Sequence, residues 1–568
     1  MKVTQRKCNY LKEGLDLHKW VQVKEELVRI LDFNIKSTCD LRKVIEWSNE
    51  LLDETEYIDI QNYVKYSLDM TNEHVNKALS EYKAQICDPS RVYFRQIEEK
   101  IMSSKYYEGL DESFDHYKNL LQRNQMLSCK KNDDLLVEEE RFCLEYRKMA
   151  SSVQIDYKGG KYTRSETNKL LSSLPEEEKK DLWIQMNEAW LEKKPILDSV
   201  FNRILAVRQE IALNCGMSNY GEYLHLKHSR FDYSLSDIKQ LHRSVEKKLV
   251  PSLRKYASLR SNLDGSFSSH PWMDDYNYEK VNLAGFDSPA DLVEKVKLIL
   301  KRIDNEFSSV FESILLKGNI DLTPKNGKTT GGFSFPIDRN GSPFICMNVA
   351  GRLKEVSILI HEIGHGVHAV FNADQKIRDC RMFSSNGELA EFPPKFFELV
   401  SLEHYDLLYK CPQDQIKAKT EFYMEVLDSF IRYIVIDSFE HWLYNNPGHT
   451  VQERDDYYSA LVDRFNINDN WTDFEHYKPL GWYNSQLVVI MPFYIISYAI
   501  AQVGAINLYK TYLHDNQETI QRLKDMMVMG FSRPIGELYE LAGIKFDFSE
   551  EELARCISFL ENKMAITH

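Results

Sequence analysis

The chain has 568 residues, of which 43% are hydrophobic and 28% are charged, and its formal net charge at pH 7 is −14. A chain of this length can bury a large core, and its composition is typical of an ordered, largely helical protein with more than one lobe. The acidic charge, in a sequence without a basic stripe, argues against a nucleic-acid-binding protein.

The ten cysteines are scattered along the chain without a CxxC pair. In a protein of this size, this pattern indicates free or buried thiols in a reducing compartment and argues against a disulfide framework. Residues 1–16 are charged and polar, without the apolar stretch that is typical of a secretory signal. We therefore predict a cytoplasmic protein.

The first 195 residues carry no catalytic motif, and we predict that residues 1–195 form an N-terminal helical region. Apolar residues recur at helical spacing in windows 16–32, 41–56 and 60–84, with many charges between them. These windows predict antiparallel helices with solvated charged faces. The motifs described below all lie later, so residues 196–568 are predicted to be the catalytic region.

The segment 327–348 is the best candidate for β-structure. Stretches 329–335 and 344–347 flank a turn-like segment at 338–342. An edge strand here could pair with an extended peptide and supply backbone hydrogen bonds. Gly331, Gly332 and Phe333 are therefore candidate substrate-binding residues. A purely structural hairpin explains the same pattern, and the sequence leaves both interpretations open.

His361, Glu362 and His365 form a complete HExxH motif. Apolar residues around it recur every three or four positions and predict a helix over 352–371. On a helix, residues four apart share a face, so both imidazoles can reach one metal ion. Glu362 points elsewhere and can act on metal-bound water, which is the zinc-peptidase arrangement. The alternative is a surface helix with two satisfied histidines.

Three further residues of this predicted helix need an explanation. Gly364 and Gly366 each destabilise a helix interior by about 1 kcal/mol relative to alanine. Close approach of another backbone or of a ligand is the simplest reason for them. His368 lies seven residues after His361, and we interpret it as a core histidine or as a residue behind the metal ligands.

Tetrahedral zinc needs one more protein ligand after the two histidines. Glu388, Glu391 and Glu398 follow the motif in sequence that is compatible with a helix, and the sequence alone leaves all three as candidates.

The segment 487–503 is nearly continuous in apolar residues and is the only stretch that resembles a membrane span. It is short for a bilayer, and Pro492, Ser497, Gln502 and two tyrosines interrupt it. We therefore predict a buried helix and no membrane association.

At this point the chain resembles an oligoendopeptidase F-like member of the thimet oligopeptidase family of zinc metallopeptidases. The resemblance extends over nearly the whole chain, and its most specific feature is HExxHGxxH followed by Glu-x-Pro about 30 residues later. The pieces that carry it are 136–146 (LVEEERFCLEY), 230–233 (RFDY), 327–328 (GK), 331–333 (GGF), 343–351 (PFICMNVAG), 356–368 and 391–398.

The resemblance implies that Glu391 is the third zinc ligand. Glu398 lies seven residues later on the same helical face, where it would orient a ligand histidine. Pro393 and Pro394 suit the first turn of a helix, so we expect the helix to begin close to Glu391. The cofactor implied is one Zn²⁺ per chain.

The implied mechanism is attack of zinc-bound water on the scissile carbonyl, with Glu362 taking the proton and passing it to the leaving amine. Relatives stabilise the oxyanion with a histidine and with tyrosines of a Phe-Tyr-x-Tyr-x-Tyr-like run. In this chain the first and last tyrosines of the run are present as Tyr494 and Tyr498, and Ile496 stands where relatives have the middle tyrosine. Ordinary core packing is the alternative role for both tyrosines.

The expected histidine is missing, because 486–489 reads Gln-Leu-Val-Val. Three explanations remain open: the two tyrosines suffice, Tyr483 substitutes as a substrate-binding residue, or activity is weak or narrowed to particular substrates.

The resemblance thus implies a mostly α, elongated metallopeptidase with a small β-sheet beside the HExxH helix and a deep substrate channel. Its substrates would be short unfolded oligopeptides, cleaved internally. Two alternatives come from other classes: a catalytically impaired, zinc-dependent peptide-binding protein, and a helical scaffold with an incidental motif. The sequence gives no indication of oligomeric state or cleavage preference.

Overall fold

The computed structural model confirms a mostly α-helical chain with two small β-sheets. The residues that it describes are 10–12, 14–171, 174–264, 270–272, 285–325, 327–329, 331–349, 351–381, 386–467 and 469–566.

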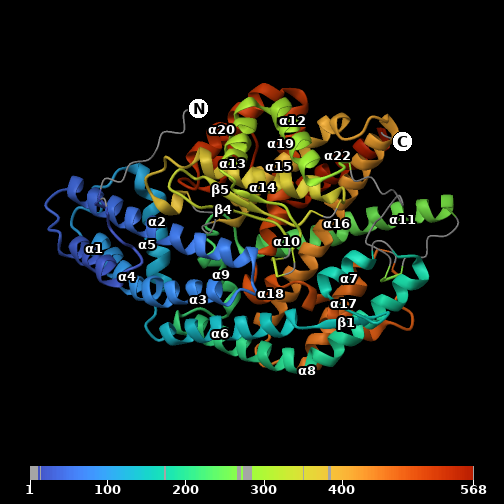
Figure 1. The fold of residues 1–568 in the computed structure, drawn as a ribbon, viewed down its shortest axis with the longest axis horizontal. Helices are drawn as coiled ribbons and strands as arrows, with labels where there is room; N and C mark the ends of the chain where they lie inside the picture. The colour runs from blue at the N-terminus through green and yellow to red at the C-terminus, as the bar shows by residue number, and fades with distance from the viewer. Residues whose placement is uncertain are drawn as a thin grey trace. The chain divides into compact units, whose positions relative to one another are not determined.

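The elements are labelled in chain order in Figure 1. The α-helices are α1 (Trp20–Asp32), α2 (Thr38–Leu68), α3 (Glu73–Tyr82), α4 (Asp88–Met102), α5 (Asp115–Leu127), α6 (Asn132–Ser151), α7 (Arg164–Leu171), α8 (Glu176–Asn214), α9 (Tyr220–Lys227), α10 (Leu235–Ser244), α11 (Val250–Asp264), α12 (Pro289–Ile303), α13 (Asn305–Leu316), α14 (Lys354–Phe371), α15 (Gly387–Ser401), α16 (Pro412–Asn445), α17 (Val451–Phe465), α18 (Leu487–Ile490), α19 (Ile495–His514), α20 (Asn516–Met529), α21 (Ile535–Leu541) and α22 (Glu550–Ile566). The strands are β1 (Gln154–Tyr157), β2 (Gly160–Thr163), β3 (Ile320–Asp321), β4 (Phe333–Pro336) and β5 (Pro343–Cys346).

The chain divides into two compact units, each built from three separate segments. The first unit comprises Met1–Arg123, Asn282–Gln415 and Gly504–Phe546. The second unit comprises Asn124–Val281, Ile416–Val503 and Asp547–His568. The division of function at residue 195 stays a prediction.

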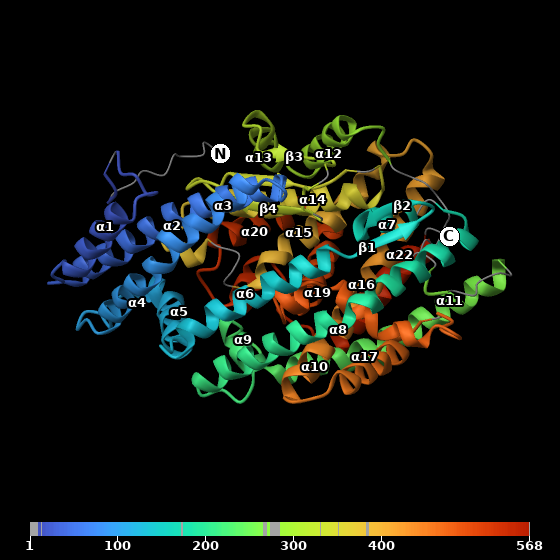
Figure 2. The ribbon, with the colours of Figure 1, turned by 60° about the horizontal axis from the view of Figure 1, so that its bottom comes forward.

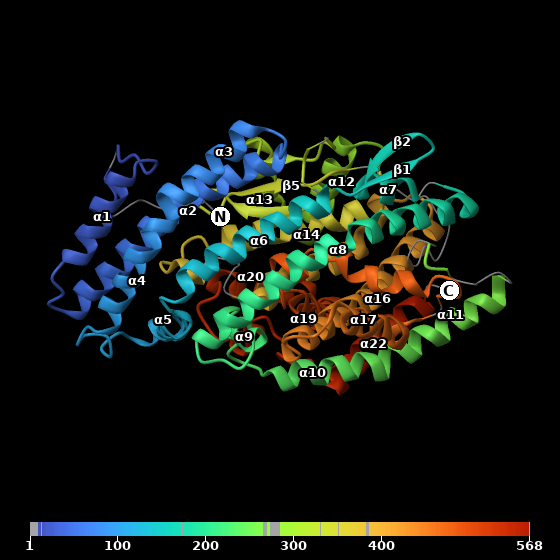
Figure 3. The ribbon, with the colours of Figure 1, turned by 90° about the horizontal axis from the view of Figure 1, so that it is seen from below.

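Helices α1, α2 and α4 pack together in the first unit (Figure 3). The predicted windows 41–56 and 60–84 differ from the observed bounds, because α2 continues without a break through the gap between them to Leu68. The second window is interrupted where the Asn72 side chain accepts hydrogen bonds from the N–H groups of His74 and Val75 and begins α3. Such a cap satisfies N–H groups that have no partner inside the helix. The core shared by α1, α2 and α4 includes Val23, Leu27, Ile30, Leu41, Val44, Ile97 and Ile101.

The three-stranded sheet has the order β3-β5-β4, with β3 parallel and β4 antiparallel to β5. It packs beside α14, as predicted for the HExxH helix (Figure 2). Strand β4 begins at Phe333, later than expected, because Gly331 has φ +85° and turns the chain just before it. Thr330, which belongs to the predicted strand, lies outside the described residues.

Helices α14 and α15 pack closely, and glycine makes this possible. A Cβ on Gly364 would lie 2.8 Å from Cα of Pro394, and a Cβ on Gly366 would lie 2.8 Å from Cγ of Pro343. The expectation that another backbone approaches this helix is therefore confirmed for Gly364.

The expected start of α15 was wrong. Asn386 caps the helix by accepting a hydrogen bond from the N–H of Leu389 at 2.9 Å, so Pro393 and Pro394 lie inside the helix and not in its first turn. A proline there removes an intrahelical hydrogen bond. We infer that its compact ring suits the crossing with Gly364.

In the second unit, α6 and α8 lie side by side (Figure 3). The apolar segment 487–503 is not one helix, because α18 ends at Ile490 and α19 begins at Ile495. Pro492 lacks an N–H group, and Phe493 has φ +60°, which an L-residue adopts only under strain. The part of the segment that lies in α19 is largely buried, as expected.

Candidate metal centre

Three of the predicted site residues meet in the first unit. His361 and His365 lie one turn apart on α14, and Glu391 comes from α15. His361 Nε2 lies 3.1 Å from His365 Nε2 and 3.2 Å from Glu391 Oε2, and His365 Nε2 lies 3.6 Å from the same oxygen. The crossing of α14 and α15 therefore brings two imidazole nitrogens and a carboxylate oxygen together.

These spacings fit a zinc ion. Tetrahedral zinc with metal–ligand bonds of about 2.0 Å places its ligand atoms about 3.3 Å apart. The three observed separations, from 3.1 to 3.6 Å, lie on both sides of that value. The Glu391 side chain is 3% exposed, whereas those of His361 and His365 are 14% and 13% exposed. The donor set and its partial access to solvent both suit a catalytic zinc site.

Glu398, which is predicted to orient a ligand histidine, lies beside His361. Its Oε1 is 2.6 Å from His361 Nδ1, so the ring can donate to it while Nε2 faces the ligand cluster. Sequence reasoning missed Lys395, whose Nζ lies 3.0 Å from the same oxygen. The three-residue spacing on one helix was a signal for this pair. Burial raises the pKa of Glu398, but the charge of Lys395 and the hydrogen bond from His361 outweigh it, so the net shift is downward.

The electrostatics of the cluster are those of a cation site. Burial lowers the pKa of His361, but the hydrogen bonds and charges of Glu391 and Glu398 outweigh it and raise the pKa to about 10. Burial lowers the pKa of His365 to about 4, so this ring is neutral and its nitrogen lone pair is available. Without an ion, a proton on His361 balances the two carboxylates, and a divalent cation would take its place.

Glu362 is buried in the same helix, and burial raises its pKa to about 7. Gly332, a predicted substrate-binding residue, lies against it: a Cβ on Gly332 would be 2.9 Å from Glu362 Oε1. Gly331 and Phe333 flank this contact at the start of β4, which is an edge strand of its sheet. The segment 331–333 and Glu362 are therefore neighbours in space, although 29 or more positions separate them in sequence.

His368 points into the core of the first unit. It is fully buried, and its ring stacks on Phe531 with centroids 5.5 Å apart. The structure thus places His368 in the core, and a role for it behind the metal ligands stays a prediction.

The three predicted tyrosines lie in the second unit. Tyr498 is half-buried and stacks on Tyr433, and Tyr494 contacts the rings of Tyr498 and His228. Tyr483 is buried, and its hydroxyl donates to Asp198 Oδ1 at 2.6 Å. Burial and the charge of Asp198 raise the pKa of Tyr483. Roles for these tyrosines at the metal centre stay predictions.

Comparison with known proteins gives one family. The model of "Peptidase family M3" matches residues 170–556 of the chain. No curated protein matches it in sequence. Among the part of the chain that the structure describes, no helix is long and apolar enough to span a bilayer.

Several solved structures share the fold at low sequence identity. PZ peptidase A with an inhibitor is 18% identical, with a TM-score of 0.85, over 100% of this chain and 99% of that one. A Bacillus anthracis protein assigned as an oligoendopeptidase F is 19% identical, with a TM-score of 0.84, over 99% of both chains. Oligoendopeptidase-F from Enterococcus faecium is 16% identical, with a TM-score of 0.67, over 96% of this chain and 97% of that one.

Proposed function

Because the chain belongs to peptidase family M3, we propose that it is a zinc-dependent endopeptidase that hydrolyses short, unfolded oligopeptides. One observation carries this proposal: His361, His365 and Glu391 converge at the spacing of zinc ligands beside the buried carboxylate of Glu362. An incidental HExxH motif would not bring a third ligand from another helix to this position.

The residues of the centre have two tasks, ion binding and proton transfer. His361, His365 and Glu391 would hold the ion, and zinc there would supply Lewis-acid chemistry to water and to the scissile carbonyl. Glu362 takes the proton of the attacking water and delivers it to the leaving amine. Burial raises the pKa of its carboxyl group, which makes the carboxylate a better proton acceptor.

Glu398 is a positioning residue in this proposal. Its contact with His361 Nδ1 fixes the ring so that Nε2 points toward the ion. Lys395 keeps Glu398 ionised, so that the carboxylate accepts the ring's hydrogen bond.

The substrate would lie along β4. The start of this edge strand adjoins Glu362 through Gly332, so a peptide pairing there would have its backbone close to the general base. Gly331 leaves open space here, because no atom lies within 4 Å of an added Cβ, whereas Gly332 lets the strand approach Glu362 closely. Tyr494 and Tyr498 are proposed as oxyanion donors, on the strength of the family resemblance.

A cytoplasmic location remains part of the proposal. The nine cysteines within the described residues are all free thiols, which suits a reducing compartment.

The test compares zinc-reconstituted wild type with Glu362→Gln on a library of quenched-fluorescent oligopeptides. We expect internal cleavage by the wild type and a loss of at least about 100-fold in the variant, with zinc content unchanged. The missing histidine at 486–489 favours one competing function, zinc-dependent peptide binding without turnover. Tight peptide binding without cleavage by either protein would establish that function and refute the peptidase.

A further inference from the structure

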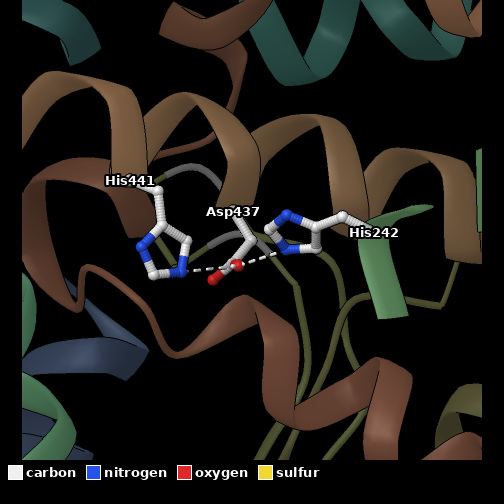
Figure 4. Close-up of side chains that lie close together, drawn as sticks. All are labelled: His242, Asp437 and His441. Atoms are coloured by element: carbon white, nitrogen blue, oxygen red, sulfur yellow. Dashed lines mark hydrogen bonds and ion pairs between the residues drawn. The ribbon is translucent and has the colours of Figure 1, made fainter. Parts of the chain in front are cut away.

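A second group of potential metal ligands lies in the second unit, outside the HExxH centre. It consists of His242 on α10 and of Asp437 and His441 on α16 (Figure 4). His242 Nε2 lies 2.7 Å from Asp437 Oδ2, and His441 Nε2 lies 3.3 Å from the same oxygen. One ligand atom from each residue lies within 4.8 Å of the others.

The donor set repeats that of the first centre, with two imidazole nitrogens and one carboxylate oxygen. Asp437 and His441 are four residues apart on one helix, so they share a face, and His242 comes from 195 positions earlier in the chain. This combination of neutral nitrogen and anionic oxygen ligands suits Zn²⁺.

Burying these side chains without a cation is unfavourable for the free energy of folding. The Asp437 side chain is fully buried, and those of His242 and His441 are 12% and 10% exposed. Within the described ranges, Asp437 Oδ1 is a buried carboxylate oxygen without a hydrogen-bond partner. A buried carboxylate oxygen without a donor destabilises the fold, and a nearby cation would offset that cost.

The surroundings would orient the ligands. Ser438 Oγ lies 3.1 Å from His242 Nδ1, so it can accept that N–H while Nε2 faces the ion. The His441 ring packs edge-on against Phe493, with centroids 4.9 Å apart. The Ser438 contact is of the kind that orients ligand histidines, in which the ring nitrogen away from the metal has a hydrogen-bond acceptor.

The group is also tied to the strained turn before α19. The N–H of Phe493 donates to Glu440 Oε2 at 3.0 Å, and Arg230 Nη2 donates to the carbonyl oxygen of Phe493 at 2.7 Å. These contacts hold Phe493 at its positive φ. Tyr494, the next residue, begins the stretch that carries the two predicted oxyanion donors.

We propose that His242, Asp437 and His441 form a second zinc site, which joins α10 to α16 and supports the turn at Phe493. Without an ion, His242 Nε2–H donates to Asp437, and zinc binding would displace that proton. The 2.7 Å contact is then a hydrogen bond, and these two side chains would separate by about 0.6 Å to reach tetrahedral spacing.

The experiment counts zinc per chain after the protein has been stripped of metal, reconstituted with Zn²⁺ and freed of excess ion. We expect two ions in the wild type and one in Asp437→Asn, an isosteric change, or in His242→Gln. His365→Gln should also hold one ion, but it should lose peptidase activity. The matched control is His225→Gln, another partly buried histidine of the second unit, and it should hold two.

A second measurement keeps His242, Asp437 and His441 unchanged, so that its result does not depend on whether variants of these residues fold. In the double variant His361→Gln/His365→Gln, added Co²⁺ should give the absorption bands of a tetrahedral ion, and Asp437→Asn in that background should abolish them. The proposal is overturned if the wild type holds one zinc that His365→Gln removes, or if the double variant gives no cobalt bands. Neither result bears on the peptidase proposal, which depends on the first centre.

Discussion

Gly332→Ala tests whether the start of β4 positions the general base. The new Cβ would lie 2.9 Å from Glu362 Oε1, against about 3.4 Å for an ordinary contact, so the carboxylate oxygen must move by 3.4 − 2.9, or about 0.5 Å. A misplacement of about 1 Å in a catalytic group can cost about 100-fold in rate. Half that displacement predicts a fall in kcat of about tenfold.

The same geometry predicts little loss of stability. The atoms in the way belong to side chains, Glu362 Oε1 at 2.9 Å and Ile358 Cγ2 at 3.1 Å, and Gly332 does not have a positive φ, so the new methyl group can be accommodated by side-chain movement without a shift of the backbone. We therefore expect kcat to fall about tenfold in a fluorogenic peptide assay while zinc content and Tm change little.

Gly536→Ala is the matched control, because no atom lies within 4 Å of its added Cβ. It should leave kcat unchanged. Wild-type kcat in Gly332→Ala would refute this account of Glu362, and loss of zinc in that variant would show that the damage extends beyond the base.

Three further predictions concern the supports of the centre. Glu398→Gln should weaken zinc binding by about 10- to 100-fold, measured by competition with a chelator, because its ligand histidine loses an anionic partner. Gly364→Ala should lower the free energy of unfolding by about 1–3 kcal/mol in urea denaturation, because its Cβ would meet backbone at Pro394. Lys328→Met should cost about 3 kcal/mol, because the buried ammonium group pairs with Asp321 and donates to three carbonyl oxygens. Burial raises the pKa of Asp321, but Lys328, Lys325 and the N–H of Thr323 together outweigh it and lower the pKa. The stabilisation from this carboxylate is therefore present above about pH 4 and lost as the pH falls below it, and the variant, which lacks the Lys328 contribution, should lose less stability in acid than the wild type.

The HExxH helix could be predicted because its signals are local. Apolar spacing gave bounds of 352–371 against the observed Lys354–Phe371, and residues four apart on a helix necessarily share a face. The glycines of the motif also indicated a close approach, which Gly364 makes to Pro394. The third ligand could not be predicted from local signals. Only the family resemblance favoured Glu391 over Glu388 and Glu398 as that ligand.

The features that sequence reasoning missed depend on distant partners. The break before α19 requires Phe493 at positive φ, and Glu440 and Arg230, far away in sequence, hold it there. His242 and Asp437 meet across 195 positions, and nothing in the sequence near either residue indicates the other. Pro393 and Pro394 led to a wrong prediction of where α15 begins, because prolines are common in the first turn of a helix. The cap at Asn386 begins this helix earlier.

The most direct test of the central claim compares Glu391→Gln with Glu388→Gln. Both residues are buried on α15, and only Glu391 lies within reach of His361 and His365. Zinc retained by the first centre is measured in the Asp437→Asn background, and cleavage of an oligopeptide is measured in the otherwise wild-type protein, because Asp437 belongs to the group proposed to support the turn before Tyr494. We predict that Glu391→Gln loses both and that Glu388→Gln keeps its zinc and its activity. Retention of zinc and activity by Glu391→Gln, with their loss in Glu388→Gln, would contradict the assigned ligand set.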